Sequence, residues 1–393
     1  MNYLEKLLQG APVEWKTLGE VLDYEQPTPF LVKSKEYSDE HETPVLTAGQ
    51  SFILGYTNET DGIYQASKEN PVIIFDDFTT SFHWVDFPFK VKSSAMKMLS
   101  PKGDTIHFKY VFYAMKCIHY KPEDHARQWI SKYSKIKIPI PPLSVQREIA
   151  RILDAFTAIT SELTSELTLR QKQYQHYRDK LLTFGDEVEW RTLGEICEKI
   201  YSGGTPKTNI PEYWENGSIP WMSSGEVNLE TIYQTEKFIT QLGLDNSSAK
   251  FVPKNSIVIA LAGQGKTRGK VARTRIDLTT NQSLASLTFN EEKINHDFVY
   301  HFLLTQYENL RQISSGSGTR GGLNLQMISN YKIPVPSLEE QKRIAAILDK
   351  FHTLTSSLSD GLPKEIELRQ KQYEYYRDLL LNFKQDEARF CMA

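Results

Sequence analysis

The chain has 393 residues and a mass of 45.3 kDa, with 40% hydrophobic and 24% charged residues. At roughly 150 residues per domain, this length predicts two or three separate cores rather than one. The 46 Lys and Arg against 49 Asp and Glu leave a net charge of −3, so any nucleic-acid site must be a local basic patch.

Cysteine spacing and hydropathy exclude further classes of protein. Cys117, Cys197 and Cys391 stand far apart with no histidine at zinc spacing, so we expect neither a disulfide framework nor a bound metal. The longest apolar runs, PVIIF and SIVIALA, have the length of strands, and the first ten residues lack a signal-peptide pattern. We therefore expect a cytoplasmic protein with no membrane partner.

Three sequence blocks occur twice, in the same order. They are VEWKTLGE (13–20) and VEWRTLGE (188–195), IPIPPLSVQ (138–146) and IPVPSLEEQ (333–341), and LRQKQYQHYRD (169–179) and LRQKQYEYYRD (368–378). Residues 3–8 also resemble residues 177–182, which predicts that the two ends of the chain meet. The interiors between the blocks barely resemble each other, which indicates a duplicated scaffold that holds two different modules, with drift after duplication as the simpler alternative.

The first interior is rich in strands and aromatic residues. Residues 72–75 form an apolar run typical of a buried strand, and residues 108–118 are apolar at helical spacing. Hydroxyl and Lys side chains follow the strand, and we consider them candidate DNA contacts: Thr79, Thr80, Ser81, Lys92, Ser93, Ser94 and Lys97. The neighbouring Phe78, Phe82 and Trp84 are more typical of an aromatic core.

A long helix follows the first proline-rich block. Proline fixes its own φ and disfavours helix at the preceding residue, so residues 138–141 should be extended. Residues 145–184 contain no Gly or Pro, and apolar or Tyr residues recur there in steps of three and four. This pattern predicts one helix of about 40 residues and about 60 Å. The unit Thr-Ser-Glu-Leu occurs twice within it, over residues 160–167.

The second interior contains a basic segment. A predicted strand at residues 257–261 leads into residues 263–275, which hold five Lys or Arg and no acid. Such a loop suits phosphate neutralisation and base contacts, although a solvated hairpin would have the same composition. The candidate contacts are Lys266, Thr267, Arg268, Lys270, Arg273 and Arg275, with Arg320 on a Gly/Ser-rich loop near a predicted helix at 297–312.

The second helical segment repeats the spacing of the first. Gly361 and Pro363 interrupt it and predict a break or kink. No catalytic motif is complete in the chain: residues 260–267 resemble a phosphate-binding loop, but Ala260 replaces its first glycine and Gly269 interrupts the helix that should follow. We therefore expect no catalytic residue.

The duplicated blocks resemble the specificity subunits of type I restriction-modification systems, over essentially the whole chain. The resemblance implies an α+β fold with two pseudo-symmetric globular target-recognition domains, separated by two long antiparallel coiled-coil helices. It assigns residues 1–137 and 188–332 to the recognition domains, 138–187 and 333–385 to the helical spacers, and 386–393 to a tail. The chain departs from the family pattern at residues 127–131, where a Gly-rich loop is missing, and at the insertion around Gly361.

The resemblance also implies partners. Each recognition domain reads one half of a bipartite, asymmetric double-stranded DNA sequence, and the helices dock two methyltransferase subunits. S-adenosylmethionine, ATP and Mg²⁺ belong to the methyltransferase and restriction subunits, and this non-catalytic chain binds no cofactor. The implied candidates for helix pairing and docking are Ile149, Ile152, Phe156, Tyr174, Tyr177, Ile344, Ile347, Phe351, Tyr373 and Tyr376.

Two other functions stay open at this point. The chain could be the recognition part of a single-chain DNA methyltransferase or nuclease, which methyl transfer by the isolated protein would reveal. It could also be a stand-alone DNA-binding clamp, in which case no methyltransferase would co-purify with it.

Overall fold

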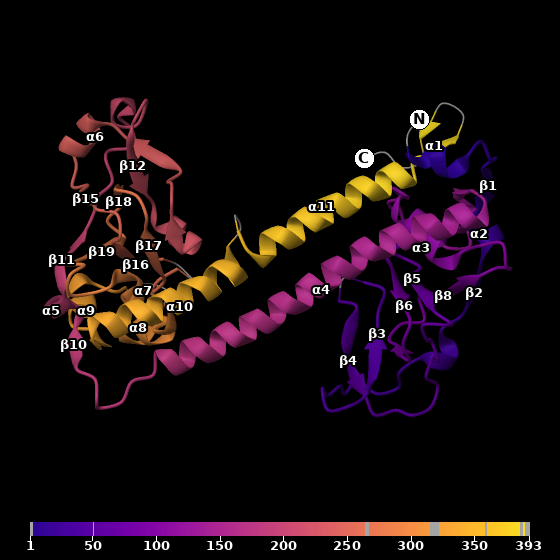
Figure 1. Cartoon of the computed structure of the whole chain (residues 1–393), viewed down its shortest axis with the longest axis horizontal. Helices are drawn as coiled ribbons and strands as arrows, with labels where there is room; N and C mark the ends of the chain where they lie inside the picture. Colours follow the sequence, from indigo (N-terminus) through magenta and orange to yellow (C-terminus); the bar gives the residue numbers. More distant parts are fainter. Residues whose placement is uncertain are drawn as a thin grey trace. The chain divides into compact units, whose positions relative to one another are not determined.

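The computed structural model describes residues 3–49, 51–263, 267–314, 322–357, 360–385 and 388–389 (Figure 1). The chain divides into two compact units, one of residues 1–164 and 365–393 (unit 1) and one of residues 165–364 (unit 2). Each unit therefore combines one predicted recognition domain with part of both helical segments. Lys266, Arg320 and most of the tail from 386 to 393 lie outside the described residues.

Unit 1 is built on a four-stranded antiparallel sheet of order β2-β8-β5-β6. Its strands are β2 (Leu22–Glu25), β8 (Met96–Pro101), β5 (Val72–Asp76) and β6 (Phe82–Val85). Alternation along β5 places Ile73 and Phe75 in one core with helix α3 (Phe108–Lys116), and Val72 and Ile74 in a second core. The predicted strand is thus buried on both faces. The second core lies against a smaller sheet of β4 (Ile53–Thr57), β3 (Thr43–Leu46) and β7 (Lys90–Val91).

Unit 2 repeats this strand order with different sequences and with one additional strand in each sheet, β13 and β15. Its larger sheet has the order β11-β19-β16-β17-β13, formed by Cys197–Ser202, Leu284–Phe289, Ile257–Ala260, Val271–Thr274 and Thr231–Ile232. Its smaller sheet has the order β14-β12-β18-β15, formed by Lys237–Ile239, Ile219–Met222, Leu278–Thr280 and Phe251–Val252. The predicted helix at 297–312 is in fact two helices, α7 (His296–Thr305) and α8 (Tyr307–Ile313), because Gln306 leaves helical geometry with ψ 10°.

The duplicated VEW(K/R)TLGE block forms the same local structure in both units. A short strand, β1 (Glu14–Thr17) or β10 (Trp190–Thr192), pairs with the proline-rich strand, β9 (Lys137–Ile140) or β20 (Lys332–Pro334). The threonine that ends the short strand caps one helical turn, α2 (Leu18–Val21) or α5 (Leu193–Ile196). In each capping box, the glutamate accepts hydrogen bonds from the threonine N–H at 2.7 Å and from its hydroxyl.

The first long helix is continuous, as predicted. Helix α4 runs over 39 residues, Leu143–Leu181, and enters unit 2 at Ser165. The second segment is broken, also as predicted, into α10 (Leu338–Ser356) and α11 (Leu362–Leu380). Gly361 turns between them with φ +96°, and a side chain there would clash with the carbonyl oxygen of Thr353.

The two ends of the described chain meet within unit 1, as the repeat predicted. Leu4, on helix α1 (Tyr3–Leu8), shares a core with Leu380, Leu381 and Phe383 (Figure 1). The remaining described elements are short: η1 (Thr28–Phe30), η2 (Tyr133–Lys135), η3 (Pro211–Tyr213), η4 (Ser224–Leu229), α6 (Gln241–Asp245), α9 (Leu325–Ser329), β21 (Lys384–Gln385) and β22 (Ala388–Arg389). Among the described helices, none is long and apolar enough to cross a membrane.

Candidate nucleic-acid interface

Two neighbouring loops of unit 1 carry the predicted hydroxyl contacts. In the turn between β5 and β6, the Asp76 carboxylate accepts hydrogen bonds from the amides of Phe78 and Thr79 at 2.9 and 2.8 Å. The backbone amide of Asp77 donates to the carbonyl of Ala95, which brings this turn beside the loop that contains Ser93 and Ser94. Both loops therefore present hydroxyl groups at the same edge of the unit.

Exposure differs sharply among the candidates of unit 1. Thr79, Ser94 and Lys92 are exposed, and Ser81 and Ser93 are partly exposed. Lys92 donates to the hydroxyl of Tyr37 at 2.9 Å, which ties its ammonium group to that side chain. Thr80 is only 8% exposed, so it offers little surface to a ligand.

Lys97 is buried completely, which corrects its prediction as a surface contact. Its ammonium lies 3.1 Å from the carboxylate of Asp77, and both side chains are at most 1% exposed. Asp77 also accepts a hydrogen bond from the amide of Trp129 at 2.8 Å. The alternation of strand β8 turns Lys97 inward, and a carboxylate from a distant segment neutralises it there.

The basic segment of unit 2 is divided between a loop and a buried strand. Thr267, Arg268 and Lys270 are partly exposed in the hairpin that joins β16 to β17. The Lys270 ammonium donates to the Asn228 side chain at 2.7 Å. The following residues, 271–274, are buried throughout as strand β17. The predicted basic loop therefore ends at Lys270.

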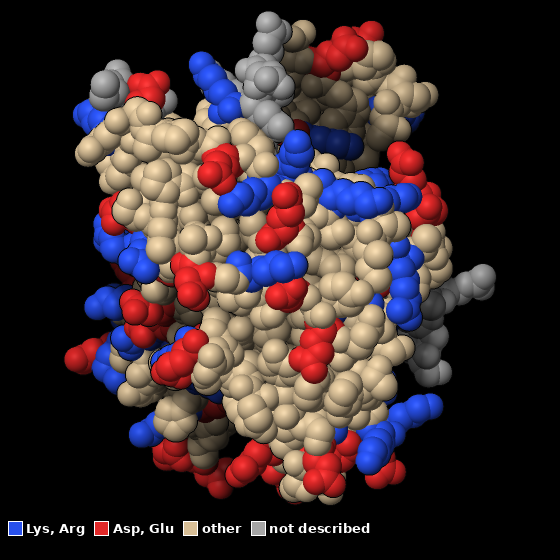
Figure 2. Space-filling view, turned by 90° about the vertical axis from the view of Figure 1, so that its right-hand side faces the viewer, with Lys and Arg blue, Asp and Glu red and all other residues tan. Residues whose placement is uncertain are grey.

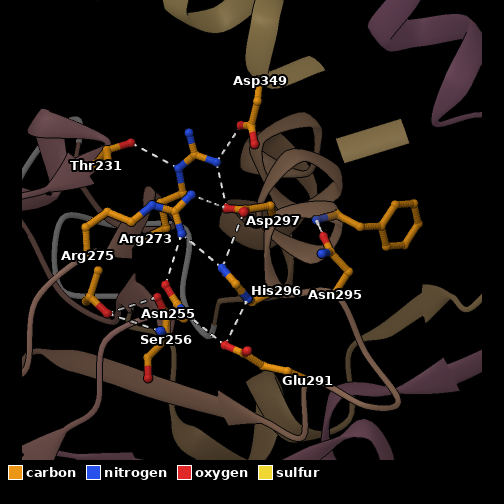
Figure 3. A network of polar contacts seen from close by, with 12 residues as sticks. Thr231, Asn255, Ser256, Arg273, Arg275, Glu291, Asn295, His296, Asp297 and Asp349 are labelled. Atoms are coloured by element: carbon orange, nitrogen blue, oxygen red, sulfur yellow. Dashed lines mark hydrogen bonds and ion pairs between the residues drawn. The ribbon is translucent and has the colours of Figure 1, made fainter. Parts of the chain in front are cut away.

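Arg273 points inward, which corrects its prediction as a DNA contact, whereas the Arg275 side chain is 22% exposed but is engaged by Asp297. Alternate residues of a strand face the same side, and this side of β17 faces α7. The Arg273 guanidinium contacts the carboxylates of Asp297 at 2.7 Å and Asp349 at 2.5 Å, and Arg275 contacts Asp297 at 2.7 Å (Figure 3). Asp297 lies 24 positions from Arg273 and Asp349 lies 76, so these partners cannot be recognised from the segment itself.

The charges of this network perturb one another. Burial alone would raise the pKa of Asp297, but the hydrogen bond from His296 and the positive charge of Arg273 outweigh it and hold that pKa far below its usual value. Burial lowers the pKa of His352 to about 4, and the adjacent Arg273 adds to this effect. The network is therefore an ionised structural cluster with a neutral histidine beside it.

The predicted helix-pairing residues fall into two groups. Ile149 and Ile344 are at most 1% exposed in the cores of units 1 and 2, so they anchor the helix to its own unit and present no docking surface. The others lie, at least partly exposed, between helices: Phe156 stacks on Tyr376 in unit 1, with ring centroids 5.0 Å apart, and Tyr177 stacks on Phe351 in unit 2 at 5.5 Å. The remaining members of this group are Ile152, Tyr174, Ile347 and Tyr373.

A groove borders the second group of residues. It lies between α4 and α10 in unit 2 and has a volume of about 600 Å³. Tyr177, Ile347 and Phe351 form its apolar lining, and Arg170, Lys180 and Arg343 add positive charge. Arg170 and Arg343 are already paired with Glu166 and Glu340, so the groove is mainly an apolar recess.

The surface charge is mixed rather than uniformly basic. On the face shown in Figure 2, Lys and Arg side chains alternate with Asp and Glu. A basic and aromatic cluster that the sequence did not indicate lies in unit 2, where the Lys250 ammonium is 5.8 Å from the Tyr201 ring. Beside it, Phe251 is 55% exposed. The exposure of Phe251 beside Lys250 makes this cluster a candidate surface for base stacking.

The comparisons with known proteins identify the family. The family model described as the type I restriction modification DNA specificity domain matches residues 12–170 and again residues 185–368. The chain belongs to the type I restriction-modification DNA specificity family. The double match corresponds to the duplicated frame of this specificity subunit.

Relatives of this specificity subunit cover nearly its whole length. It is 51% identical to the Escherichia coli type I restriction enzyme EcoR124I/EcoR124II specificity subunit, covering 99% of this chain and 98% of that protein. It is 32% identical to a putative type I restriction enzyme specificity subunit of Haemophilus influenzae, covering 97% and 98%. The crystal structure of a type I restriction-modification S subunit from M. genitalium shares the fold, with a TM-score of 0.68, 17% identity, and coverage of 98% of this chain and 100% of that one.

Proposed function

We propose that this chain is the DNA sequence-recognition subunit of a type I restriction-modification complex. One half of a bipartite, asymmetric target is read by each unit. The observation that carries the proposal is that the two units share one frame and the same order of the common strands, while the sequences of their candidate contact loops differ. Two unlike recognition surfaces on one chain suit two unlike half-sites, whose binding energies add.

The proposed DNA contacts are the accessible members of the predicted set. In unit 1 they are Thr79, Ser81, Lys92, Ser93 and Ser94. In unit 2 they are Thr267, Arg268 and Lys270, with Lys266 and Arg320 retained as candidates outside the described residues. Lys and Arg would neutralise phosphates or contact guanine edges, and the hydroxyls would bond to either phosphates or bases.

We further propose that α4 forms antiparallel coiled-coil contacts with α10 and α11, and that these helices dock two methyltransferase subunits. The stacked pairs Phe156–Tyr376 and Tyr177–Phe351 support the pairing, and the groove beside Tyr177 supports docking. The methyltransferase would supply S-adenosylmethionine, and restriction subunits would add ATP- and Mg²⁺-dependent cleavage. This chain would act in the cytoplasm, on genomic DNA, without a cofactor or catalytic residue of its own.

The decisive experiment is to co-express the chain with its methyltransferase in a host that lacks adenine methylation, and to sequence the modified adenines in single molecules. We expect one bipartite motif with a fixed gap. Methylation by the isolated chain would instead support a single-chain enzyme, and failure to bind a methyltransferase would support a stand-alone clamp. A continuous, palindromic motif would contradict two different half-sites.

A further inference from the structure

The duplicated helix carries an aspartate at the same position in each unit. Asp154 follows Ile152 and Leu153 in α4, and Asp349 follows Ile347 and Leu348 in α10. Both lie where the helix passes its unit's core, since the preceding leucine is fully buried in each case. The two carboxylates therefore occupy equivalent places on the two scaffold helices.

Buried glutamines align the recognition modules with these helices. The Gln146 side-chain oxygen accepts from the amide of His107, and the Gln341 oxygen accepts from the amide of Asn295, both at 2.9 Å. His107 and Asn295 each immediately precede the recognition-domain helix, α3 or α7. Counted from these two equivalent residues, Lys109 of α3 corresponds to Asp297 of α7, and Tyr113 corresponds to His301.

In unit 2 the scaffold aspartate holds a strand and a helix together. Asp349 accepts hydrogen bonds from Arg273 on β17 at 2.5 Å and from His301 on α7 at 2.9 Å. The guanidinium of Arg273 also donates to Thr231 and lies over the ring of Tyr300. The side chains of Arg273 and His301 are 6% and 0% exposed, while the Asp349 carboxylate that accepts from both is 31% exposed.

In unit 1 the equivalent aspartate is bound by different chemistry. Asp154 accepts from the Tyr113 hydroxyl at 2.6 Å, and the Lys109 ammonium lies 3.8 Å from it. The same ammonium lies 3.8 Å from the ring centroid of Trp84 on β6. Trp84 pairs with Ile73 in the larger sheet of unit 1, and Arg273 pairs with Ile257 in the larger sheet of unit 2. Trp84 and Arg273 therefore occupy equivalent positions in the two sheets.

One acceptor thus serves two unrelated sets of donors. All three module residues differ between the copies, yet the scaffold carboxylate is the same and bonds to the same helix position. We propose that Asp154 and Asp349 are positioning residues, each of which aligns one strand, β6 or β17, with one helix, α3 or α7, of its own unit and thereby controls reading of one half-site. This inference rests on the proposed recognition function.

The strands that these aspartates align lead directly from the candidate DNA contacts. Lys270 closes the hairpin before β17, where its carbonyl accepts from Ala260 and its amide donates to Thr267. Arg273 lies three residues further on. In unit 1, β6 begins at Phe82, directly after Ser81. A shift of either strand therefore moves the contacts of that unit.

The test compares Asp349→Asn with Asp154→Asn in the complete complex with its methyltransferase, using single-molecule sequencing of modified adenines. Each substitution keeps the shape of the side chain but removes its charge. We expect each variant to lose about tenfold in discrimination at one half-site, and the two variants to affect opposite halves. Glu148→Gln, at the surface ion pair with Arg151 on α4, is the matched control and should leave both halves unchanged.

The outcomes separate this inference from the proposed function. A wild-type complex without a bipartite motif would refute the recognition function itself. A normal wild-type motif with both aspartate variants unaltered, or with both relaxing both halves, would overturn the positioning role. If Asp349→Asn does not give a folded complex, His301→Gln is the second variant. It removes one donor to the same carboxylate and should relax the half-site that unit 2 reads. Asp349→Glu keeps the charge and should relax that half-site less.

Discussion

At the scale of single residues, the role of a cation depends on where the nearest acid lies. Lys92 and Lys97 are five positions apart and equally plausible as surface contacts in the sequence. Lys92 is exposed and bonds to Tyr37, whereas Lys97 is buried against Asp77. Their different environments predict opposite consequences of the same substitution.

Lys97→Ala should destabilise unit 1 by about 3–5 kcal/mol, because it leaves the Asp77 carboxylate buried without its counter-charge. Lys92→Ala should change the free energy of unfolding by less than about 0.5 kcal/mol, but weaken DNA binding and reduce its salt slope by about one. Denaturant unfolding and salt titrations of the complex measure the two effects. Equal stability of the two variants would contradict the buried ion pair.

The neutral histidine of unit 2 predicts a pH dependence. The pKa of His352 is about 4 in the folded chain, below its ordinary value near 6.5, so the unfolded chain binds more protons between these values. The stability of unit 2 is therefore fully present above about pH 6.5 and should fall by up to about 3 kcal/mol as the pH drops toward 4. Glu230, Arg273, His301 and Asp349 surround this ring.

His352→Gln should reduce this pH dependence without abolishing it, because burial also lowers the pKa of His301; thermal unfolding between pH 7 and pH 4.5 measures the change. His176→Gln, at an exposed position of α4, is the control and should retain the wild-type slope. A slope that is unchanged in His352→Gln would show that other groups cause it.

At the scale of elements, the two helical segments differ in continuity although their sequences are repeats. Helix α4 runs unbroken for 39 residues, while Gly361 separates α10 from α11. The Thr-Ser-Glu-Leu unit repeated at residues 160–167 lies within α4, across the boundary between the units at 164/165. An insertion or deletion at this point should change only the length of the helix between the two units.

Deletion of residues 164–167 should shorten α4 by about 6 Å and rotate the following helix by only about 40°. Since DNA rises about 3.4 Å per base pair, we expect the gap between the half-sites to shrink by one or two base pairs. Sequencing of modified adenines measures the gap directly. An unchanged gap would refute the role of α4 in setting it.

At the scale of the whole molecule, the duplication separates a common scaffold from exchangeable modules. The capping boxes, the paired strands and the Gln146 and Gln341 bonds are the same in both units. Each module meets its scaffold helix at an aspartate that accepts different donors. The scaffold should therefore accept an unrelated module that brings its own donors.

Exchange of residues 21–137 for the corresponding interior of another family member should change one half-site and leave the other unaltered. The reason is that the core of unit 2 contains none of the exchanged residues. The methylated motif of the chimera measures this, and exchange of the scaffold residues alone is the control. A change in both halves would refute the model of two independent recognition modules.

Much of the fold could be predicted from the sequence, because it depends on local patterns. The repeat, the continuous helix, the break at Gly361 and the buried strands each follow from residue spacing, Pro and Gly positions or hydrophobic periodicity. The division of residues 263–275 could not be predicted, since a basic run looks the same in a loop and in a buried strand.

The sequence alone determined the family and the duplicated scaffold, because these are recorded in contiguous blocks of residues that each occur twice. Only the tertiary structure decided which charges face solvent. Asp77, Asp297 and Asp349 come from distant segments and neutralise Lys97 and Arg273 in the interior. A buried charge is stable only beside an opposite charge, and that neighbour is supplied by the fold rather than by the adjacent residues.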